Sequence, residues 1–302
     1  MNIYDLKSSN IRKTWLLCLV FFLVVIGIGW ILSYVYQDQS ILYIAVVLSI
    51  GMNMIAYWKS DAIALASYNA KEADKNTYKE IYRIVENLAI TAGISQPRLY
   101  IIDSDSPNAF ATGRNPKHAA IALTTSIIQR LEKSELEGVI AHELSHIRNY
   151  DTLIMTVVVV LVGIVSIIAD IFIRMSFWGG GRGRDNDREG GGIMMVVGIV
   201  AIIIAPIAGT LLQLAISRKR EFIADASGVL LTRYPEGLAN ALRKISESQP
   251  FEKQKQATAH LFITNPMHLD APGKRKSFLA GLFMTHPPVE DRIKALLNQK
   301  DN

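Results

Sequence analysis

The sequence predicts a mostly helical integral membrane protein that combines about four transmembrane helices with an α+β domain containing a small sheet. Half of the 302 residues are hydrophobic, and the excess is concentrated in four runs. Each run is long enough to cross a bilayer, which needs roughly 20 apolar residues. Outside these runs the composition is that of a soluble domain, in which short strand candidates are confined to one segment.

The four apolar runs carry aromatic and basic residues near their ends, a pattern typical of anchoring at the membrane interface. The first run has no clear small-residue cleavage site, and the second run follows it almost at once. We therefore interpret it as a retained signal anchor rather than a cleaved signal peptide. The runs cover residues 14–35, 41–58, 152–173 and 193–216.

The runs define the predicted domain organisation. Residues 1–59 hold two transmembrane helices, and residues 152–216 form a transmembrane hairpin around a glycine-rich loop at 174–192. Residues 60–151 and 217–302 then form the two parts of one cytoplasmic domain. Basic residues precede the first run and follow the second and fourth, so the positive-inside rule places both termini and the soluble parts in the cytoplasm. Four arginines in the glycine-rich loop count against this orientation.

Composition also excludes some functions. The net charge is +5, but aromatic and basic residues do not interleave in a nucleic-acid-binding motif, so we expect no nucleic-acid partner. The single cysteine, Cys18, cannot form an intramolecular disulfide and is interpreted as an apolar residue inside the first run.

The soluble parts contain recognisable elements. Apolar residues at helical spacing predict a helix over 77–94, and "RLYIID", "NAFATG" and "HAAIAL" are strand candidates. The segment "SELEGVIAHELSHIRNY" predicts a helix with Ser134 as N-cap and Glu137 as its capping-box partner. Residues 217–302 are predicted to be mostly helical, with a break near 266–273.

The helix that ends the first soluble part carries a motif for metal chemistry. His142 and His146 are one turn apart, so both imidazoles can point at a single ion. Glu143 lies about 100° further round the helix, where it can reach a water molecule at the ion without becoming a ligand. Three protein ligands and one water are typical of catalytic zinc. Glu143 would act as general base and then pass the proton to the leaving amine.

The third ligand is predicted from "SRKREFIADASG". Glu221 would complete a site for one Zn²⁺ per chain, and Asp225, one turn later, would accept a hydrogen bond from the ring of a ligand histidine, preferably His142. Two histidines and a glutamate suit zinc best, although cobalt or manganese could occupy such a site. Arg292 is expected to be a surface charge on the last helix, with pairing to a carboxylate near the site as the alternative.

The motifs "AHELSHIRNYD", "SRKREFIADASG", "NAFATGR" and "LFMTHPPVEDRI" together resemble the HtpX membrane metalloproteases, a branch of the gluzincin clan that includes the CAAX prenyl proteases. The resemblance covers nearly the whole chain. It implies a zincin-like metalloprotease domain and a zinc-dependent endopeptidase of the bacterial inner membrane, with its active site facing the cytoplasm. Its substrates would be misfolded or damaged membrane proteins, in a stress response that overlaps with an ATP-dependent membrane protease.

The resemblance also implies two further roles. An edge strand beside the zinc would bind an extended substrate by strand addition, and His286 in "THPP" would donate a hydrogen bond to the oxyanion. The strand residues are Asn108, Ala109, Phe110 and Ala111.

Three alternatives remain open. A CAAX-type protease of prenylated peptides would need more spans around a large chamber, and a non-catalytic scaffold with a structural zinc would have no use for Glu143. A small transporter would need buried ionisable residues within its spans, where this sequence has almost none.

Overall fold

The computed structural model describes residues 3–179, 218–248, 263 and 287–298. The fourth apolar run, residues 180–192 of the glycine-rich loop and His286 therefore lie outside the described residues. The longest helices are α1 (Ile3–Tyr36), α2 (Ser40–Trp58) and α7 (Asp151–Gly179). The other helices are α3 (Ser60–Ser67), α4 (Lys79–Ala92), α5 (Thr125–Arg130), α6 (Lys133–Arg148), α9 (Arg218–Thr232), α10 (Pro235–Ser246) and α12 (Val289–Asn298), with a 3₁₀ turn at Pro116–His118.

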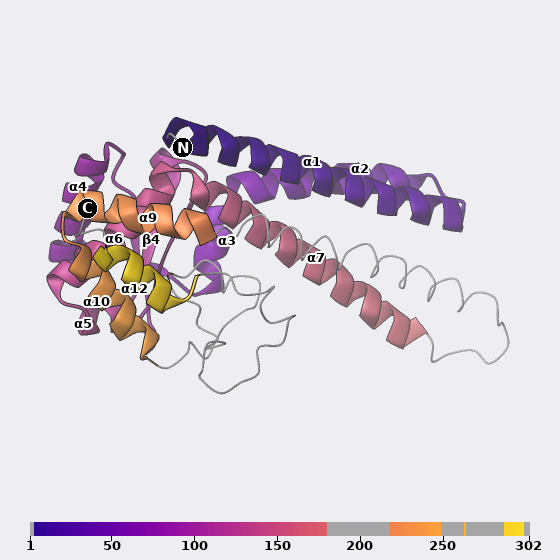
Figure 1. The fold of residues 1–302 in the computed structure, drawn as a ribbon. Helices are drawn as coiled ribbons and strands as arrows, with labels where there is room; N and C mark the ends of the chain where they lie inside the picture. Colours follow the sequence, from indigo (N-terminus) through magenta and orange to yellow (C-terminus); the bar gives the residue numbers. More distant parts are fainter. Residues whose placement is uncertain (1–2, 180–217, 249–262, 264–286, 299–302) are drawn as a thin grey trace.

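Helices α1 and α2 form an antiparallel pair that extends away from the rest of the molecule (Figure 1). A Cβ added to Gly29 of α1 would overlap the Cβ of Ala45 of α2, so the missing side chain lets the two helices approach closely. The pair also exposes large apolar side chains such as Trp15, Leu23 and Val47. An exposed apolar surface of this kind suits a lipid environment.

The predicted number of spans is only partly matched. By length and composition, Leu6–Tyr36 and Ser40–Trp58 can each cross a membrane. Helices α6 and α7 pass the same test only as a pair bent by 81°, which gives two or at most three candidate spans among the described residues. The third predicted run, 152–173, lies within α7.

The sheet of the soluble part has four strands: β1 (Lys71–Glu72), β2 (Arg98–Ile102), β3 (Ala109–Gly113) and β4 (Ala119–Thr124). Their order is β1-β2-β4-β3, which places β3 at one edge. Strands β2 and β4 are parallel, whereas β3 is antiparallel to β4. The three predicted strands are thus present, and β1 is an addition too short to have a sequence pattern.

Helices cover both faces of this sheet. On one face Leu99, Ala111 and Ile121 pack in a core with residues of α4, α6 and α10. On the other face Phe110 packs with residues of α3 and with Val159 of α7. Strand β3 therefore lies between the helix with the histidine motif and a predicted membrane helix.

The start of α6 differs from the prediction. Its N-cap is Glu132, whose backbone N–H donates to Oε2 of Glu135 over 2.8 Å. Ser134 and Glu137 lie inside the helix, so the predicted capping box was wrong. The physical reason is that Glu132 and Glu135 have the same spacing two residues earlier, and Lys244 of α10 holds Glu135 at 2.7 Å.

A sharp bend joins α6 to α7. Tyr150 adopts a left-handed backbone conformation with φ of 60°, which is unfavourable for a bulky residue and needs support from its surroundings. The ammonium group of Lys7 in α1 lies 4.8 Å from the centroid of the Tyr150 ring. The bend thus lies directly against the first membrane helix.

Candidate metal centre

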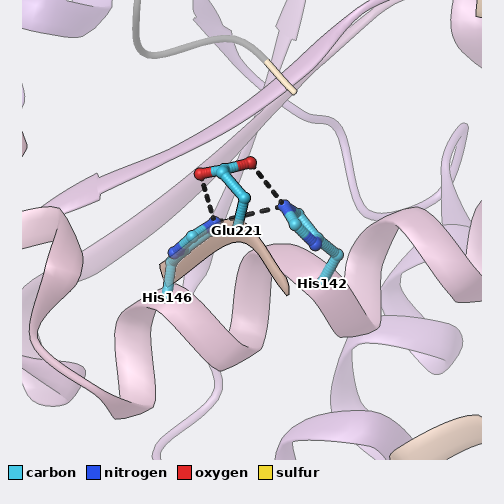
Figure 2. Close-up of side chains that lie close together, drawn as sticks. All are labelled: His142, His146 and Glu221. Atoms are coloured by element: carbon cyan, nitrogen blue, oxygen red, sulfur yellow. Dashed lines mark hydrogen bonds and ion pairs between the residues drawn. The ribbon is translucent and has the colours of Figure 1, made fainter. Parts of the chain in front are cut away.

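The two motif histidines of α6, His142 and His146, converge in the protein interior. Their Nε2 atoms lie 3.1 Å apart, and both residues are buried. The helical repeat alone places them on one face, because positions i and i+4 are stacked one turn apart. Figure 2 shows both rings close to the carboxylate of a third residue, Glu221.

Glu221 comes from α9. Its Oε1 lies 3.6 Å from His146 Nε2 and its Oε2 lies 3.8 Å from His142 Nε2 (Figure 2). Helix α9 can come this close because Gly228 faces α6: a Cβ there would lie 3.1 Å from the backbone nitrogen of His142. Within the described residues, His142, His146 and Glu221 form a group that could hold a metal ion.

The donor set fits zinc in both chemistry and spacing. Ligands at about 2.05 Å around a tetrahedral ion are separated by about 3.3 Å. Here the two Nε2 atoms lie 3.1 Å apart, and each lies 3.6 or 3.8 Å from a different oxygen of the Glu221 carboxylate. The Nδ1 atoms of both rings face carboxylates, so in the neutral rings the two Nε2 lone pairs point toward each other. A cation between them, either a proton on one ring or a metal ion, would remove this repulsion.

Asp225 orients His142. Its Oδ1 lies 2.8 Å from His142 Nδ1, one turn along α9 from Glu221. Burial lowers the pKa of His142, which keeps the ring neutral as a metal ligand must be. Burial would raise the pKa of Asp225, but Arg292 and His142 hold it below its usual value.

The sequence prediction placed Arg292 incorrectly. It is fully buried rather than exposed on α12. Its Nε and Nη2 donate to Oδ2 and Oδ1 of Asp225 over 2.8 and 2.6 Å, and its Nη1 donates to the carbonyl of Ile263 over 2.8 Å. The alternative interpretation, a pair with a carboxylate near the site, is confirmed.

Asp151 orients the second histidine and was not predicted. Its Oδ2 lies 3.0 Å from His146 Nδ1, so each motif histidine has its own carboxylate. Burial lowers the pKa of His146, but Asp151, Glu221 and Glu143 together raise it to about 9. The negative field that favours a proton there would equally favour a metal cation. The one sequence signal available was an aspartate just beyond the end of the helix.

Glu143 lies on α6 between the two motif histidines and is buried. Burial raises its pKa most and Glu221 raises it further, while His146, the Ala111 backbone and Arg292 lower it, with a result of about 7. A carboxylate with a pKa near neutrality can both accept and return a proton. The arrangement can therefore support hydrolysis at a metal ion.

The predicted substrate strand corresponds to β3 and the residue before it. The carbonyl of Ala109 accepts a hydrogen bond from the amide of Ile263 over 3.1 Å. The backbone of Ala111 hydrogen-bonds to Glu143. The backbone of this strand is therefore in direct contact with the neighbourhood of the three converging side chains.

The other two residues of the predicted strand have different surroundings. Phe110 points to the opposite face of the sheet, where its ring centroid lies 5.8 Å from that of Tyr68. Asn108 folds back, so that its Oδ1 accepts from the Ala109 amide over 3.0 Å. The alanine side chains of this segment therefore lie on the side of α6, whereas the Phe110 side chain lies on the other side.

Comparison with known proteins gives a clear family. The model of peptidase family M48 matches residues 75–300. The protease HtpX homologue of Thermoanaerobacter pseudethanolicus is 44% identical over 301 residues, 97% of each chain. The protease HtpX homologue of Pyrococcus furiosus is 46% identical over 274 residues, 90% of this chain and 89% of its own.

Among solved structures, S. mikatae Ste24p superposes with a TM-score of 0.51 at 17% identity, over 94% of this chain and 67% of that one. At this identity the likeness concerns the fold alone. The family match and the curated relatives confirm the resemblance drawn from the sequence motifs. The chain therefore belongs to peptidase family M48 and is a membrane metalloprotease.

Proposed function

We propose that the chain is a zinc-dependent endopeptidase in which His142, His146 and Glu221 hold one Zn²⁺. The observation that carries this proposal is the convergence of their donor atoms, separated by 3.1, 3.6 and 3.8 Å. Zinc, when bound, activates a water molecule and polarises a carbonyl group. Asp225 and Asp151 fix the orientation of the two histidine rings.

Glu143 is proposed as the general base. It stands beside the three converging groups without being one of them, and its pKa of about 7 suits transfer of a proton from water to the departing amine near neutral pH. His286 is proposed as a donor to the oxyanion on the strength of its motif alone, because it lies outside the described residues.

Residues Asn108, Ala109, Phe110 and Ala111 are proposed to bind the substrate as a strand added to the edge of β3. The backbone of Ala111 hydrogen-bonds to Glu143, so this edge runs past the proposed base. The carbonyl of Ala109 accepts from Ile263, and a substrate strand would share or replace that partner. Ala109 and Ala111 belong to the core on the α6 side, whereas Phe110 belongs to the opposite core. The small side chains on the α6 side would let a substrate backbone come close.

The proposed substrates are misfolded or damaged membrane proteins cut at the cytoplasmic face of the inner membrane, in a stress response that overlaps with an ATP-dependent membrane protease. The position of the site supports this class, because α6 ends at the bend where it meets α7 and α1.

We further propose that residues 60–151 and 217–302 act as one cytoplasmic domain around the hairpin of 152–216. A CAAX-type protease and a non-catalytic scaffold remain the alternatives.

The test of the reaction compares wild type and Glu143→Gln on unfolded casein, on a truncated membrane protein and on a prenylated peptide. Loss of the base should reduce cleavage by roughly 10²- to 10⁴-fold, with zinc content unchanged. Glu137→Gln is the matched control, because this partly exposed carboxylate lies on the same helix but outside the site. Equal cleavage by wild type and Glu143→Gln would refute the mechanism, and cleavage of prenylated peptides alone would favour the CAAX-type alternative.

The test of orientation uses a cysteine-free chain, made by Cys18→Ala, with a new cysteine placed in residues 179–192. A membrane-impermeant thiol reagent should label it from the outside of the cell. Labelling only after the membrane is opened would place this loop in the cytoplasm and contradict the proposed topology.

A further inference from the structure

Each motif histidine is oriented by a carboxylate, and each carboxylate is held by a donor from one end of the described chain. Arg292 of α12 binds Asp225 through two parallel hydrogen bonds. On the other side of the site, Asp151 is bound by Asn10, which lies near the start of the first membrane helix α1. The contact between Arg292 and Asp225 lies within the protease domain. The contact between Asn10 and Asp151 joins that domain to the first membrane helix.

Asn10 is buried, with 2% of its surface exposed. Its Nδ2 donates to the carbonyl of Asn149 over 2.9 Å and to Oδ1 of Asp151 over 2.7 Å. Both partners are acceptors, so the nitrogen of the amide must lie on this side and both of its hydrogens are used. Its Oδ1 lies 3.5 Å from Nη1 of Arg220, the residue before Glu221. All polar atoms of the Asn10 side chain therefore face the metal-site elements.

The two oxygens of Asp151 have separate partners. Oδ1 receives the hydrogen bond from Asn10 and lies 3.6 Å from Arg220 Nη1, whereas Oδ2 faces Nδ1 of His146 at 3.0 Å. A carboxylate held at both oxygens cannot rotate without losing one of these contacts. The hydrogen bond from Asn10 therefore constrains the plane of Asp151, and Asp151 constrains the ring of His146.

We propose that Asn10 is a positioning residue of the metal centre: by donating a hydrogen bond to Asp151 it fixes the orientation of His146, so that the first membrane helix completes the site. This inference rests on the proposed metal-binding role of His146. It assigns to a membrane helix a function in metal binding in addition to anchoring the chain.

Two substitutions separate a donor role from a packing role. Asn10→Leu keeps the branching and nearly the size of the side chain but replaces the amide by apolar atoms, so the donor is lost and no charge is added beside Asp151. Asn10→Ala removes both the donor and the volume. If Asn10 only fills space, the leucine variant should resemble the wild type and the alanine variant should be worse. If Asn10 acts as a donor, the leucine variant should be about as defective as the alanine variant.

The experiment titrates the purified, metal-free full chain in detergent with Co²⁺, and follows the visible absorption bands of the bound ion. Their position and intensity report coordination geometry, and the titration gives the affinity. We expect both Asn10 variants to bind Co²⁺ about tenfold more weakly, at the lower end of the effect of partners of ligand residues, and to show altered bands. Asn53→Ala in α2 is the control, because its Nδ2 donates to Ser49 within its own helix.

The results distinguish this inference from the proposed site itself. His146→Ala should abolish stoichiometric Co²⁺ binding, and unchanged binding would overturn the metal site. If His146→Ala loses the metal but Asn10→Leu binds it within about twofold of the wild type with the same bands, only the role of Asn10 is overturned. Should Asn10→Leu not fold, Asn10→Ala compared with Asn53→Ala decides, and equal affinities again overturn the proposal.

Discussion

Replacing Arg292 by methionine should strongly destabilise the protein, because it leaves a buried charge without its partner. Arg292 is fully buried and donates to both oxygens of Asp225, over 2.8 and 2.6 Å, and to the carbonyl of Ile263 over 2.8 Å. Removal of one partner of such a pair costs about 3–5 kcal/mol. For a domain of this size, each kcal/mol lowers the melting temperature by about 2–4 °C, so the expected loss is roughly 6–20 °C.

The assay is thermal unfolding of the detergent-solubilised chain, followed by circular dichroism. Lys294→Met is the matched control, because Lys294 is exposed on the same helix and its loss should change stability by no more than about 0.5 kcal/mol. Asp225→Asn and the double variant complete a cycle, in which we expect a coupling energy of at least about 1.5 kcal/mol between Arg292 and Asp225. If Arg292→Met and Lys294→Met have the same melting temperature, the buried pair of Arg292 and Asp225 does not stabilise the fold as argued.

Three further outcomes follow from the site. Gly228→Ala should weaken zinc binding several-fold, because the new Cβ would lie 3.1 Å from the backbone of His142 and push α9 away from α6. Gly163→Ala is the control, because its new Cβ would meet nothing within 4 Å and should leave zinc affinity unchanged. Equal zinc affinities of the two variants would contradict the close approach of α9 to α6. The pKa of about 9 for His146 means that a proton competes with the metal below that pH. Apparent zinc affinity, measured by chelator competition, should therefore rise by up to about tenfold per pH unit until about pH 9, and Asp151→Asn should shift this plateau to lower pH. Zinc at about 100 times its Kd should stabilise the folded chain by about 2.7 kcal/mol. In the wild type this should appear as a higher melting temperature that a chelator reverses. In His146→Ala neither zinc nor the chelator should change the melting temperature.

The proposed ligand set was the most predictable part of the candidate site because it depends on local geometry. His142 and His146 share a helix, and one helical turn is enough to place them together. Glu221 and Asp225 likewise share α9, so their spacing predicts that one can face the ion while the other faces a histidine. Only the approach of the two helices needed the three-dimensional fold. The family motif supplied that step in the sequence, and Gly228 explains it physically.

The residues that hold these ligands were harder to predict because their roles depend on distant contacts. Arg292 belongs to a short amphipathic helix, where an arginine is normally exposed, and only the packing of α12 turns it inward. Asp151 lies at a helix start, where a carboxylate is common without any metal. The capping box failed for a related reason, since two glutamates at the same spacing competed with Ser134 and Glu137.

The placement of a water-using site beside a membrane helix follows from how its ligands are held. The first turn of α7 supplies Asp151, and α1 supplies the amide that binds Asp151. The support for His146 therefore comes from one candidate membrane span, α1, and from a helix that qualifies as a span together with α6. The support for the other histidine depends on Arg292, near the opposite end of the chain. Metal affinity should therefore depend on the membrane helices being assembled correctly, and an isolated soluble fragment would lack Asn10. A fragment of residues 60–151 joined to 217–302 that bound zinc as tightly as the full chain would refute this dependence.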